Sequence, residues 1–272
     1  MKGEFAKLVE QVRVQSPLVH HITNYVTVND CANITLAIGA SPIMADAPEE
    51  AADIAGIASS VVLNMGTLNA RTVSSMLAAG KAANSAGIPV VFDPVGAGAS
   101  PFRNETATHI LQQMRVDILR GNISEIRFLA GLRSETKGVD ASDSDLLNTQ
   151  NAQDIARALG SQLGCVVAIT GKVDVVSNGD TALLIENGHA MLSRLTGTGC
   201  MCSSLIGSFC GAAPKQPLEA TAAALLAMGI AGEMAYERAG ERGNGSFRVA
   251  LHDVMSHMDA QTLEKRAKYH ET

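Results

Sequence analysis

Four short runs of apolar and β-branched residues recur along the chain, and each is followed by a turn that carries glycine or asparagine. The runs are Val61–Asn64, Val90–Asp93, Val116–Leu119 and Val166–Ile169. Runs of this length and composition are typical of strands that are buried on both faces of a parallel sheet. Because parallel strands need a crossover between them, usually a helix, this pattern restricts the possible folds more than any other feature.

The segments between these runs have helical spacing and the length that a crossover helix needs. They are Thr72–Ala86, Glu105–Arg115 and Asn151–Leu163. Repeated β-α-β units predict an α/β fold of three layers, a central and mostly parallel sheet with helices on both faces. Asp140–Asn151, which precedes the third helix, is polar enough to be a surface loop.

The pattern changes in the last hundred residues. An antiparallel hairpin around Asn178-Gly179-Asp180 is predicted from the flanking runs Val173–Val176 and Thr181–Ile185. Three helices are then expected, at Cys200–Gly211, Glu219–Ala239 and Phe247–Ala267, with a loop at Gly240–Ser246. No repeat or linker-like change of composition divides the chain, so residues 1–272 are expected to form a single domain.

The composition excludes several classes of function. The 272 residues are 46% hydrophobic, enough for a large core without disulfides, and the five cysteines are an odd number that lacks paired zinc-site spacings. The net charge of -6 is spread over stretches of mixed sign, so no basic face for nucleic acid is expected. No apolar signal segment follows Met1, and no apolar run approaches the roughly 18 residues of a membrane span. We therefore expect a cytoplasmic protein that binds neither nucleic acid nor membrane.

Ligands of an open parallel sheet bind beyond the carboxyl ends of its strands, so the residues that follow each strand are informative. Asp93-Pro94-Val95-Gly96-Ala97-Gly98 places a carboxylate at a strand end, before small residues that let a metal-bound phosphate approach. An Asp-Pro turn explains the same residues equally well.

Arg120-Gly121-Asn122-Ile123-Ser124-Glu125 follows the next predicted strand. Asn122 and Glu125 have the spacing of a capping box, which begins many ordinary helices. Arg120, however, is a cation at the carboxyl edge of the sheet that can bind phosphate oxygens, and Glu125 can hold magnesium through water. Both interpretations of this segment stay open.

Two further turns are informative, one directly after a predicted strand and one directly before a predicted helix. Ile169-Thr170-Gly171-Lys172 offers a hydroxyl, a glycine and a lysine to a nucleotide phosphate or ribose, or is a plain turn. Leu195-Thr196-Gly197-Thr198-Gly199-Cys200 leads into an apolar helix and is the strongest local signal. Backbone N–H groups at Gly197 and Gly199, with the helix N-terminus, can form an anion hole for a transferring phosphoryl group. A turn with two glycines before a helix is also common without any function.

Signatures of two other enzyme classes are absent from the sequence. Lys81 and Lys172 follow glycines, but neither has the earlier glycine that a Walker A loop requires. There is no His-Glu-x-x-His zinc motif, and His20-His21 are adjacent in the chain, so we assign them no metal.

Taken in order, the motifs Asp-Pro-x-Gly-x-Gly, Arg-Gly-Asn-x-x-Glu, Thr-Gly and Thr-Gly-x-Gly-Cys closely resemble the hydroxyethylthiazole kinase family of the ribokinase-like superfamily. The resemblance covers nearly the whole chain and includes Ser16–Val26, Gly39–Met44, Leu63–Thr67 and Gly245–Phe247. It implies a ribokinase-like fold and transfer of the γ-phosphate of ATP, with Mg²⁺ as cofactor, to the hydroxyl of 4-methyl-5-(2-hydroxyethyl)thiazole. The product would serve thiamine biosynthesis or salvage.

The resemblance also implies a role for individual residues. It implies a homotrimer with thiazole sites at the subunit boundaries, and magnesium support, through water, from Asp93 and Glu125. The thiazole would contact Asn24, Val26, Met44, Gly66 and Gly197. ATP would contact Arg120, Asn122, Thr170 and Thr198.

Most of the superfamily carries Asp as the catalytic base at the end of the Gly-x-Gly turn, whereas this chain has Cys200. We expect Cys200, Gly197 and Gly199 to be the catalytic groups. Because phosphoryl transfer passes through a loose transition state, a strong base is not required. Two roles for the thiol stay open: it accepts the proton of the substrate hydroxyl, or it only shapes the pocket. The other cysteines, which we expect in the core, are Cys31, Cys165, Cys202 and Cys210.

Three alternatives remain at this point. A hydroxymethylpyrimidine kinase shares the fold and the reaction type, but should carry Asp at position 200 and lack the His-x-Ile-Thr-Asn segment that ends at Asn24. An ATP-dependent dehydratase of hydrated nicotinamide nucleotides shares the architecture, but forms no phosphorylated product. A non-catalytic nucleotide-binding module would bind ATP without turnover.

Overall fold

A computed structural model describes residues 2–131 and 144–272 of the chain. The strands of these residues form one sheet in the order β2-β1-β3-β4-β5-β6-β7-β8-β9. Their bounds are β1 (Leu18–Ile22), β2 (Ser41–Ile43), β3 (Ser60–Asn64), β4 (Val90–Asp93), β5 (Ile118–Asn122), β6 (Val166–Thr170), β7 (Asp174–Ser177), β8 (Ala182–Ile185) and β9 (Tyr269–Glu271). Neighbours from β2 to β6 pair in parallel, and β7, β8 and β9 are antiparallel additions. The predicted central, mostly parallel sheet and its added hairpin are confirmed.

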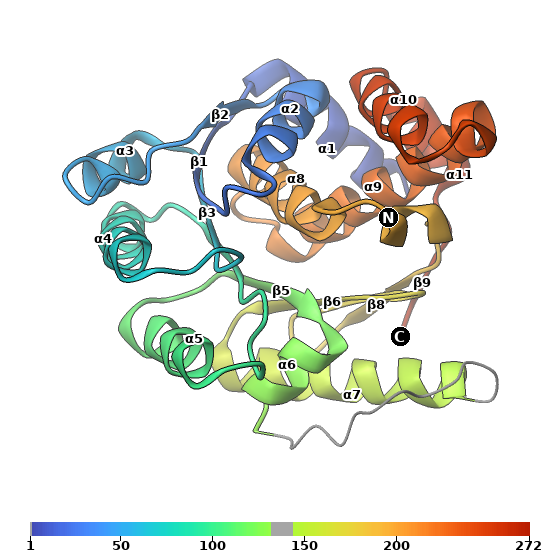
Figure 1. Ribbon diagram of the computed structural model, residues 1–272. Coiled ribbons are helices and arrows are strands. Elements are labelled where there is room, and N and C mark those ends of the chain that lie inside the picture. The colour runs from blue at the N-terminus through green and yellow to red at the C-terminus, as the bar shows by residue number, and fades with distance from the viewer. Residues whose placement is uncertain (1, 132–143) are drawn as a thin grey trace.

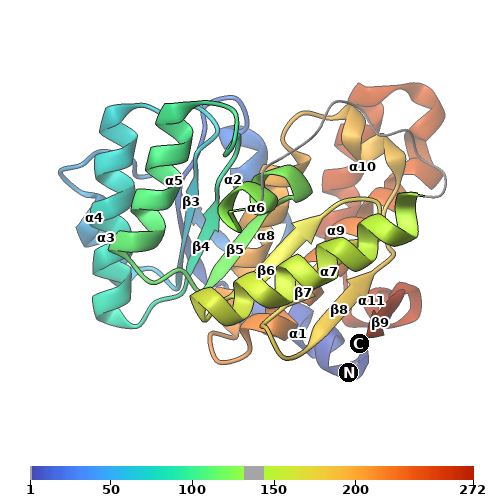
Figure 2. The ribbon, with the colours of Figure 1, turned by 90° about the horizontal axis from the view of Figure 1, so that it is seen from below.

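Two groups of helices cover the two faces of this sheet (Figures 1 and 2). One group consists of α3 (Ala51–Ile57), α4 (Ala70–Ala86), α5 (Pro101–Gln113), α6 (Ile123–Leu129) and α7 (Ser144–Leu163). The other consists of α1 (Lys2–Gln15), α2 (Val28–Ile38), α8 (Thr198–Ala212), α9 (Pro217–Ala239), α10 (Asn244–Ser256) and α11 (Ala260–Arg266). Short 3₁₀ helices, η1 (Ala190–Arg194) and η2 (Gly240–Arg242), precede α8 and α10.

The central positions of β3 and β4 are all apolar because each face of the sheet has a core. Val62 and Val91 join the cluster beneath α8 and α9. Val61, Leu63 and Phe92, one residue away in each strand, join the cluster beneath α4 and α5. Side chains of a strand point alternately to its two faces, so continuous apolar runs are what a sheet with two covered faces requires.

Helix α8 lies unusually close to the middle of the sheet, where it packs against β1, β3 and β4. A Cβ atom at Gly207 would come within 2.5 Å of Val62 Cγ2, so only glycine permits this approach. Ser60 Oγ of β3 also donates a 2.7 Å hydrogen bond to the Gly207 carbonyl. These contacts fix the axis of α8.

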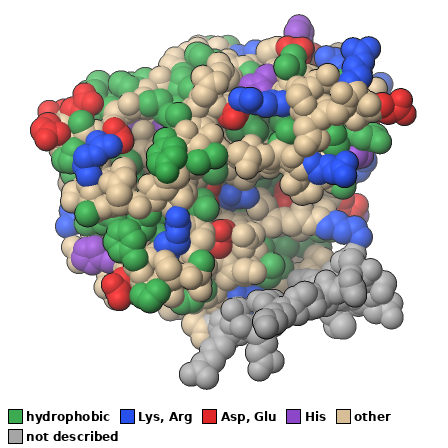
Figure 3. All heavy atoms as spheres, viewed as in Figure 1, with side chains coloured by type: hydrophobic (Ala, Val, Ile, Leu, Met, Phe, Trp, Pro, Cys, Tyr) green, Lys and Arg blue, Asp and Glu red, His purple; other side chains and the backbone are tan. Residues whose placement is uncertain are grey.

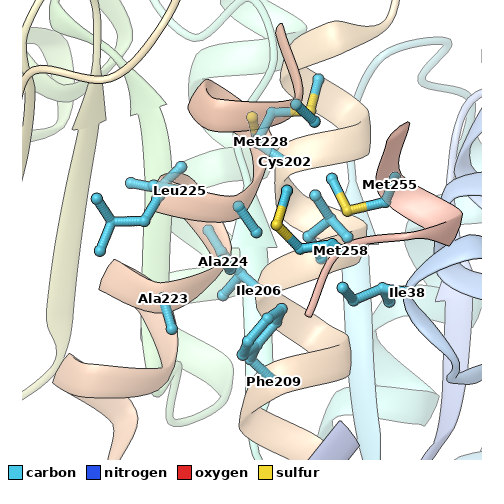
Figure 4. Close-up of a cluster of buried hydrophobic side chains, with 14 of the residues drawn as sticks. Ile38, Cys202, Ile206, Phe209, Ala223, Ala224, Leu225, Met228, Met255 and Met258 are labelled. Carbon is cyan, nitrogen blue, oxygen red and sulfur yellow. The ribbon is translucent and has the colours of Figure 1, made fainter. Parts of the chain in front are cut away.

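Helix α9 is long and apolar enough to cross a membrane, but 83% of its apolar window is buried inside the molecule. It packs on α8, and Figure 4 shows side chains of both helices in one buried cluster, among them Cys202 and Ile206 of α8 and Ala224 and Met228 of α9. The helix is therefore part of the core. On the face seen in Figure 3, acidic and basic side chains are interspersed, with no extended area of one sign.

The helices differ most from the sequence-based expectation in two places. Ser144–Asn151, expected in a polar loop, is the first part of α7, whereas residues 140–143 of that loop lie outside the described residues. The single helix expected at Phe247–Ala267 is two helices. Asp259 accepts a hydrogen bond from the Thr262 N–H and so begins α11, because an Asp side chain competes for backbone donors that a continuous helix would use internally.

Candidate active site

Side chains from six parallel strands meet at the carboxyl edge of the sheet. In the spatial order from β2 to β6 they are Met44, Asn24, Asn64, Asp93, Arg120 and Thr170. Each lies at or within two residues of the end of its strand. The parallel registers, such as Asn64 beside Asp93, bring together residues that are far apart in the chain. This edge is where ligands of such sheets bind.

The sulfur of Cys200, in the first turn of α8, lies against this row of side chains. Asn24 Nδ2 and Asn64 Nδ2 each lie 3.3 Å from Cys200 Sγ and donate to it. The two asparagines are buried, while Cys200 is half-buried. The thiol is thus held by polar groups on its inner side and is open on its outer side.

Asp93 lies behind the asparagines and is fully buried. Its Oδ2 accepts hydrogen bonds from Ser203 Oγ at 2.7 Å, Asn64 Nδ2 at 2.9 Å and Arg120 Nη1 at 3.3 Å. Burial raises the pKa of the Asp93 carboxyl, and these same donors oppose that rise because they favour the charged form.

Arg120 is buried and fixed from two sides. Its Nη1 pairs with Asp93, and its Nη2 donates to Thr170 Oγ1 at 2.5 Å. The backbone of Gly199 covers the guanidinium so closely that a Cβ there would lie 2.7 Å from Arg120 Nη1. A cation held in this way needs no rearrangement to bind a phosphate.

The N-terminus of α8 has no side-chain cap. Its N-cap residue is Gly197, with φ of 90°, and no side chain accepts a hydrogen bond from the first turn. A Cβ at Gly197 would also lie 2.6 Å from Thr27 Cγ2. The first N–H groups of a helix lack internal partners, so those of this turn are available to an anion.

A cavity of about 870 Å³ opens beside Arg120, on the side of β6. Its polar walls include Thr170, Lys172, Asp174, Thr198 and Gly199, and its apolar floor includes Cys202, Leu225 and Met228. Asp174 Oδ1 accepts a 2.8 Å hydrogen bond from the Gly171 N–H. Burial raises the pKa of Asp174 to about 7, although that bond and the charge of Arg120 oppose the rise. Its size and mixed lining suit a nucleotide.

Asn122 and Glu125 form a complete capping box at the start of α6. The Glu125 N–H donates to Asn122 Oδ1 at 3.0 Å, and the Asn122 N–H donates to Glu125 Oε2 at 2.8 Å. Glu125 Oε1 accepts a further hydrogen bond from the Gly96 N–H, at 2.8 Å. Burial raises the pKa of Glu125, and the two backbone donors oppose that rise. The carboxylate therefore joins the turn after β4 to α6.

The carboxylates of Asp93 and Glu125 have the chemistry to hold a magnesium ion that is bound to a nucleotide. Asp93 Oδ1 is buried and has no hydrogen-bond partner among the described residues. The described residues hold no group of three or more His, Cys, Asp or Glu side chains that could bind a metal ion alone. Mg²⁺ usually takes one or two carboxylates together with phosphates and several waters, which is the kind of site these residues could complete.

The predicted site residues fall into two groups on either side of Cys200. Arg120, Thr170, Thr198 and Gly199 line the cavity. Asn24 contacts Cys200 on the other side, where Gly66 lies so near that a Cβ would be 2.5 Å from Asn24 Nδ2.

The remaining predicted residues lie at the margins of the site. Val26 is exposed and Met44 is half-buried. The Asn122 side chain caps α6 and is not among the residues that line the cavity. Sequence reasoning assigned no role to Asn64, Ser203 or Asp174. The available signal for Asn64 was a single polar residue that ends an apolar run at the carboxyl edge of the sheet.

The chain is similar to several known proteins over nearly its whole length. The model of the hydroxyethylthiazole kinase family matches residues 9–261. A hydroxyethylthiazole kinase of Ruminiclostridium cellulolyticum is 54% identical over 268 residues, which are 98% of this chain and 97% of that protein. A hydroxyethylthiazole kinase structure from Pyrococcus horikoshii OT3 is 39% identical, has a TM-score of 0.89 and covers 99% of both chains. Bacillus subtilis pyridoxal kinase, in a complex with ADP, is 17% identical and shares the fold, with a TM-score of 0.57 over 79% of this chain and 90% of that chain. The predicted ribokinase-like fold is confirmed.

Proposed function

The chain belongs to the hydroxyethylthiazole kinase family and is an ATP-dependent kinase, and we propose that its reaction takes place around Cys200. The reaction transfers the γ-phosphate of ATP to the hydroxyl of 4-methyl-5-(2-hydroxyethyl)thiazole. The observation that carries the assignment of the site is the meeting of the uncapped α8 N-terminus with the buried guanidinium of Arg120. Together they provide N–H donors and a fixed cation where a transferring phosphoryl group develops charge.

ATP occupies the cavity beside β6 in this proposal. Its phosphates extend toward Arg120 and the turn at Gly197–Gly199, and the apolar floor from α8 and α9 receives the base. Asp93 and Thr170 both hydrogen-bond to the guanidinium and so orient it. Bound Mg²⁺ would neutralise phosphate charge, with Asp93 and Glu125 holding it through water.

The thiazole alcohol binds on the other side of Cys200, near Asn24. Its hydroxyl attacks the γ-phosphorus in line and loses its proton late, because the transition state of phosphoryl transfer is loose. The open side of Cys200 Sγ then receives that proton. Positioning by Asn24 and charge stabilisation by the α8 N–H groups supply most of the catalysis.

The finer features of the resemblance complete the proposal. A homotrimer with thiazole sites at subunit boundaries is supported by Tyr25 and Val26, which follow Asn24 and are 79% and 57% exposed. Apolar side chains this exposed beside a site are suited to cover by a second subunit. We also propose that residues 1–272 act as one domain of a soluble cytoplasmic enzyme of thiamine biosynthesis or salvage.

The test is an ATP/Mg²⁺ phosphorylation assay that compares hydroxyethylthiazole with hydroxymethylpyrimidine and detects the phosphorylated product by mass. Phosphate on the thiazole alcohol alone is expected. Transfer to the pyrimidine would favour a hydroxymethylpyrimidine kinase. ATP-dependent dehydration of a hydrated nicotinamide nucleotide, without a phosphorylated product, would favour the dehydratase. Binding of ATP without any turnover would contradict an enzymatic role.

A further inference from the structure

Asn64 connects the Cys200 sulfur to the buried Asp93 carboxylate. Its side chain, at the end of β3, takes part in four hydrogen bonds, to Cys200, Asp93, Asn24 and the backbone of Gly66. Neither the motifs nor the comparisons assign it a role. We propose that Asn64 is a positioning residue for phosphoryl transfer, which, with Asn24, presents Cys200 Sγ to the substrate hydroxyl as a hydrogen-bond acceptor. The inference rests on the proposed reaction at Cys200.

The orientation of the Asn64 amide follows from its partners. Its Oδ1 accepts from the Gly66 N–H at 2.9 Å, and its Nδ2 donates to Asp93 Oδ2 at 2.9 Å. A flipped amide would place its oxygen against the Asp93 carboxylate and its NH₂ against the Gly66 N–H, which leaves buried groups unpaired. One N–H of Nδ2 is thus bound to Asp93, and the other points at Cys200 Sγ.

The Asn24 amide is oriented in the same way. Its Oδ1 accepts from the Thr27 N–H and the Thr27 hydroxyl, both at 3.1 Å. Its Nδ2 donates one hydrogen to Asn64 Oδ1 at 2.9 Å and directs the other at Cys200 Sγ. Every polar atom of both amides is therefore used, and neither side chain can turn without breaking several hydrogen bonds.

These two donors decide which side of the sulfur is reactive. Both N–H groups occupy the buried side of Sγ, so a thiol proton can point only to the open side, where the substrate hydroxyl binds. When the sulfur carries no proton, the same two donors stabilise its charge and leave its open side to accept the hydroxyl proton. That step starts from the thiolate: the substrate O–H bond breaks, an S–H bond forms, and the oxygen bonds to the γ-phosphorus as ADP departs with the bridging oxygen. The thiol then gives its proton to water through its open side.

The test is a double-mutant cycle on the full chain, with Asn64→Leu made in wild type and in Cys200→Ala. Leu has a similar volume and no donor. In wild type, Asn64→Leu should lower kcat about tenfold or more, as the loss of about 1.4 kcal/mol of transition-state stabilisation predicts. The KM for ATP should change less than about threefold, because the phosphate-binding groups are intact. In Cys200→Ala the same change should lower kcat by less than about twofold.

Asn84→Leu is the matched control, because the Asn84 amide also bonds through both of its polar atoms, to the backbone of Arg115, in the last turn of α4 and away from the carboxyl edge of the sheet. It should lower the thermal unfolding temperature and leave kcat unchanged. If Asn64→Leu does not fold, as judged by circular dichroism, Asn64→Ala replaces it in the cycle. An equal fall of kcat with and without the Cys200 sulfur would overturn the proposal, since Asn64 would then act through Asp93 and Arg120. A wild type that does not phosphorylate the thiazole at all would instead contradict the proposed function.

Discussion

Asp93 and Arg120 show how single residues at this site are constrained by one another. The carboxylate is fully buried and accepts from Arg120, Ser203 and Asn64 at one oxygen. Asp93 and Arg120 form a buried ion pair, and removing either member would leave the other charge uncompensated, at a cost of about 3–5 kcal/mol. The residues that orient Arg120 and Cys200 are thus as important to the site as the groups that contact the substrate.

At the residue scale, we predict that Asp174 makes ATP binding depend on pH. Its carboxyl has a pKa of about 7 and lines the same cavity as Arg120. Above that pH its negative charge opposes the nucleotide phosphates, so the KM for ATP should rise from about pH 6 to about pH 8. Asp174→Asn keeps an oxygen for the Gly171 N–H and should flatten this rise. Initial rates measured against ATP concentration at each pH give the KM. Protonation of ATP itself affects wild type and variant equally, so the difference between them isolates the contribution of Asp174. An unchanged slope in the variant would assign the pH dependence elsewhere.

Gly199 gives a second prediction at this scale. A Cβ there would lie 2.7 Å from Arg120 Nη1, and the guanidinium cannot move away without breaking its bonds to Asp93 and Thr170. Overpacking costs about 1–3 kcal/mol, so Gly199→Ala should reduce kcat about tenfold or more. Gly56→Ala is the control, because nothing lies within 4 Å of a Cβ at that helical position. Steady-state kinetics that show equal activities for the two variants would refute the argument.

At the scale of elements, the ends of two helices serve different purposes. Helix α8 has a glycine as N-cap and leaves its first N–H groups free of side-chain caps, whereas α6 begins with a closed capping box. An uncapped end costs stability and leaves its first N–H groups to an anion, whereas in a capped end side chains already accept from those N–H groups.

Glu125→Ala tests what the carboxylate at α6 contributes. The change removes acceptors from the Asn122 and Gly96 N–H groups and should lower the free energy of unfolding by about 1–2 kcal/mol without Mg²⁺ or ATP. It should also raise the Mg²⁺ concentration needed for half-maximal rate. Asp259→Ala removes the N-cap of α11, away from the site, and should lower stability without changing the Mg²⁺ requirement. Urea unfolding and Mg²⁺ titrations measure the two effects, and an unchanged Mg²⁺ requirement in Glu125→Ala would leave the residue a structural role alone.

At the scale of the whole molecule, the two covered faces of the sheet bury titratable groups as well as apolar ones. His20 and His21 of β1 are both buried, and burial lowers the pKa of His21 to about 4. The neutral rings therefore belong to the folded state, and the unfolded state takes up protons first as the pH falls.

The stability of the molecule should accordingly decrease on acidification. Between the unfolded pKa of His, about 6.5, and the folded value of about 4, the unfolded state binds more protons, so unfolding becomes easier by up to roughly 3 kcal/mol for His21. Urea unfolding at a series of pH values measures this slope, and His21→Gln should reduce it. His109→Gln, on the exposed side of α5, controls for loss of a histidine. A slope that persists in full without His21 would have to come from other groups.

Local patterns predicted a large part of this molecule. Apolar runs located β3, β4, β5 and β6, and glycine-containing turns located Arg120, Thr170 and the start of α8, because these signals lie within a few neighbouring residues. The strands β1, β2 and β9 were not predicted, since His, Ser, Pro and Glu interrupt or replace the apolar residues of these short segments.

The contacts within the site could not be predicted in the same way. Three contacts depend on the register of the parallel strands and on the close packing of α8. Asn64 donates to Cys200, Asp174 lines the cavity beside Arg120, and Asp93 accepts from both Asn64 and Arg120. The sequence thus determines which segments become strands and turns, because propensity and periodicity act locally. Tertiary packing decides which side chains meet, because a hydrogen bond between residues 64 and 200 exists only after the sheet and α8 bring them together.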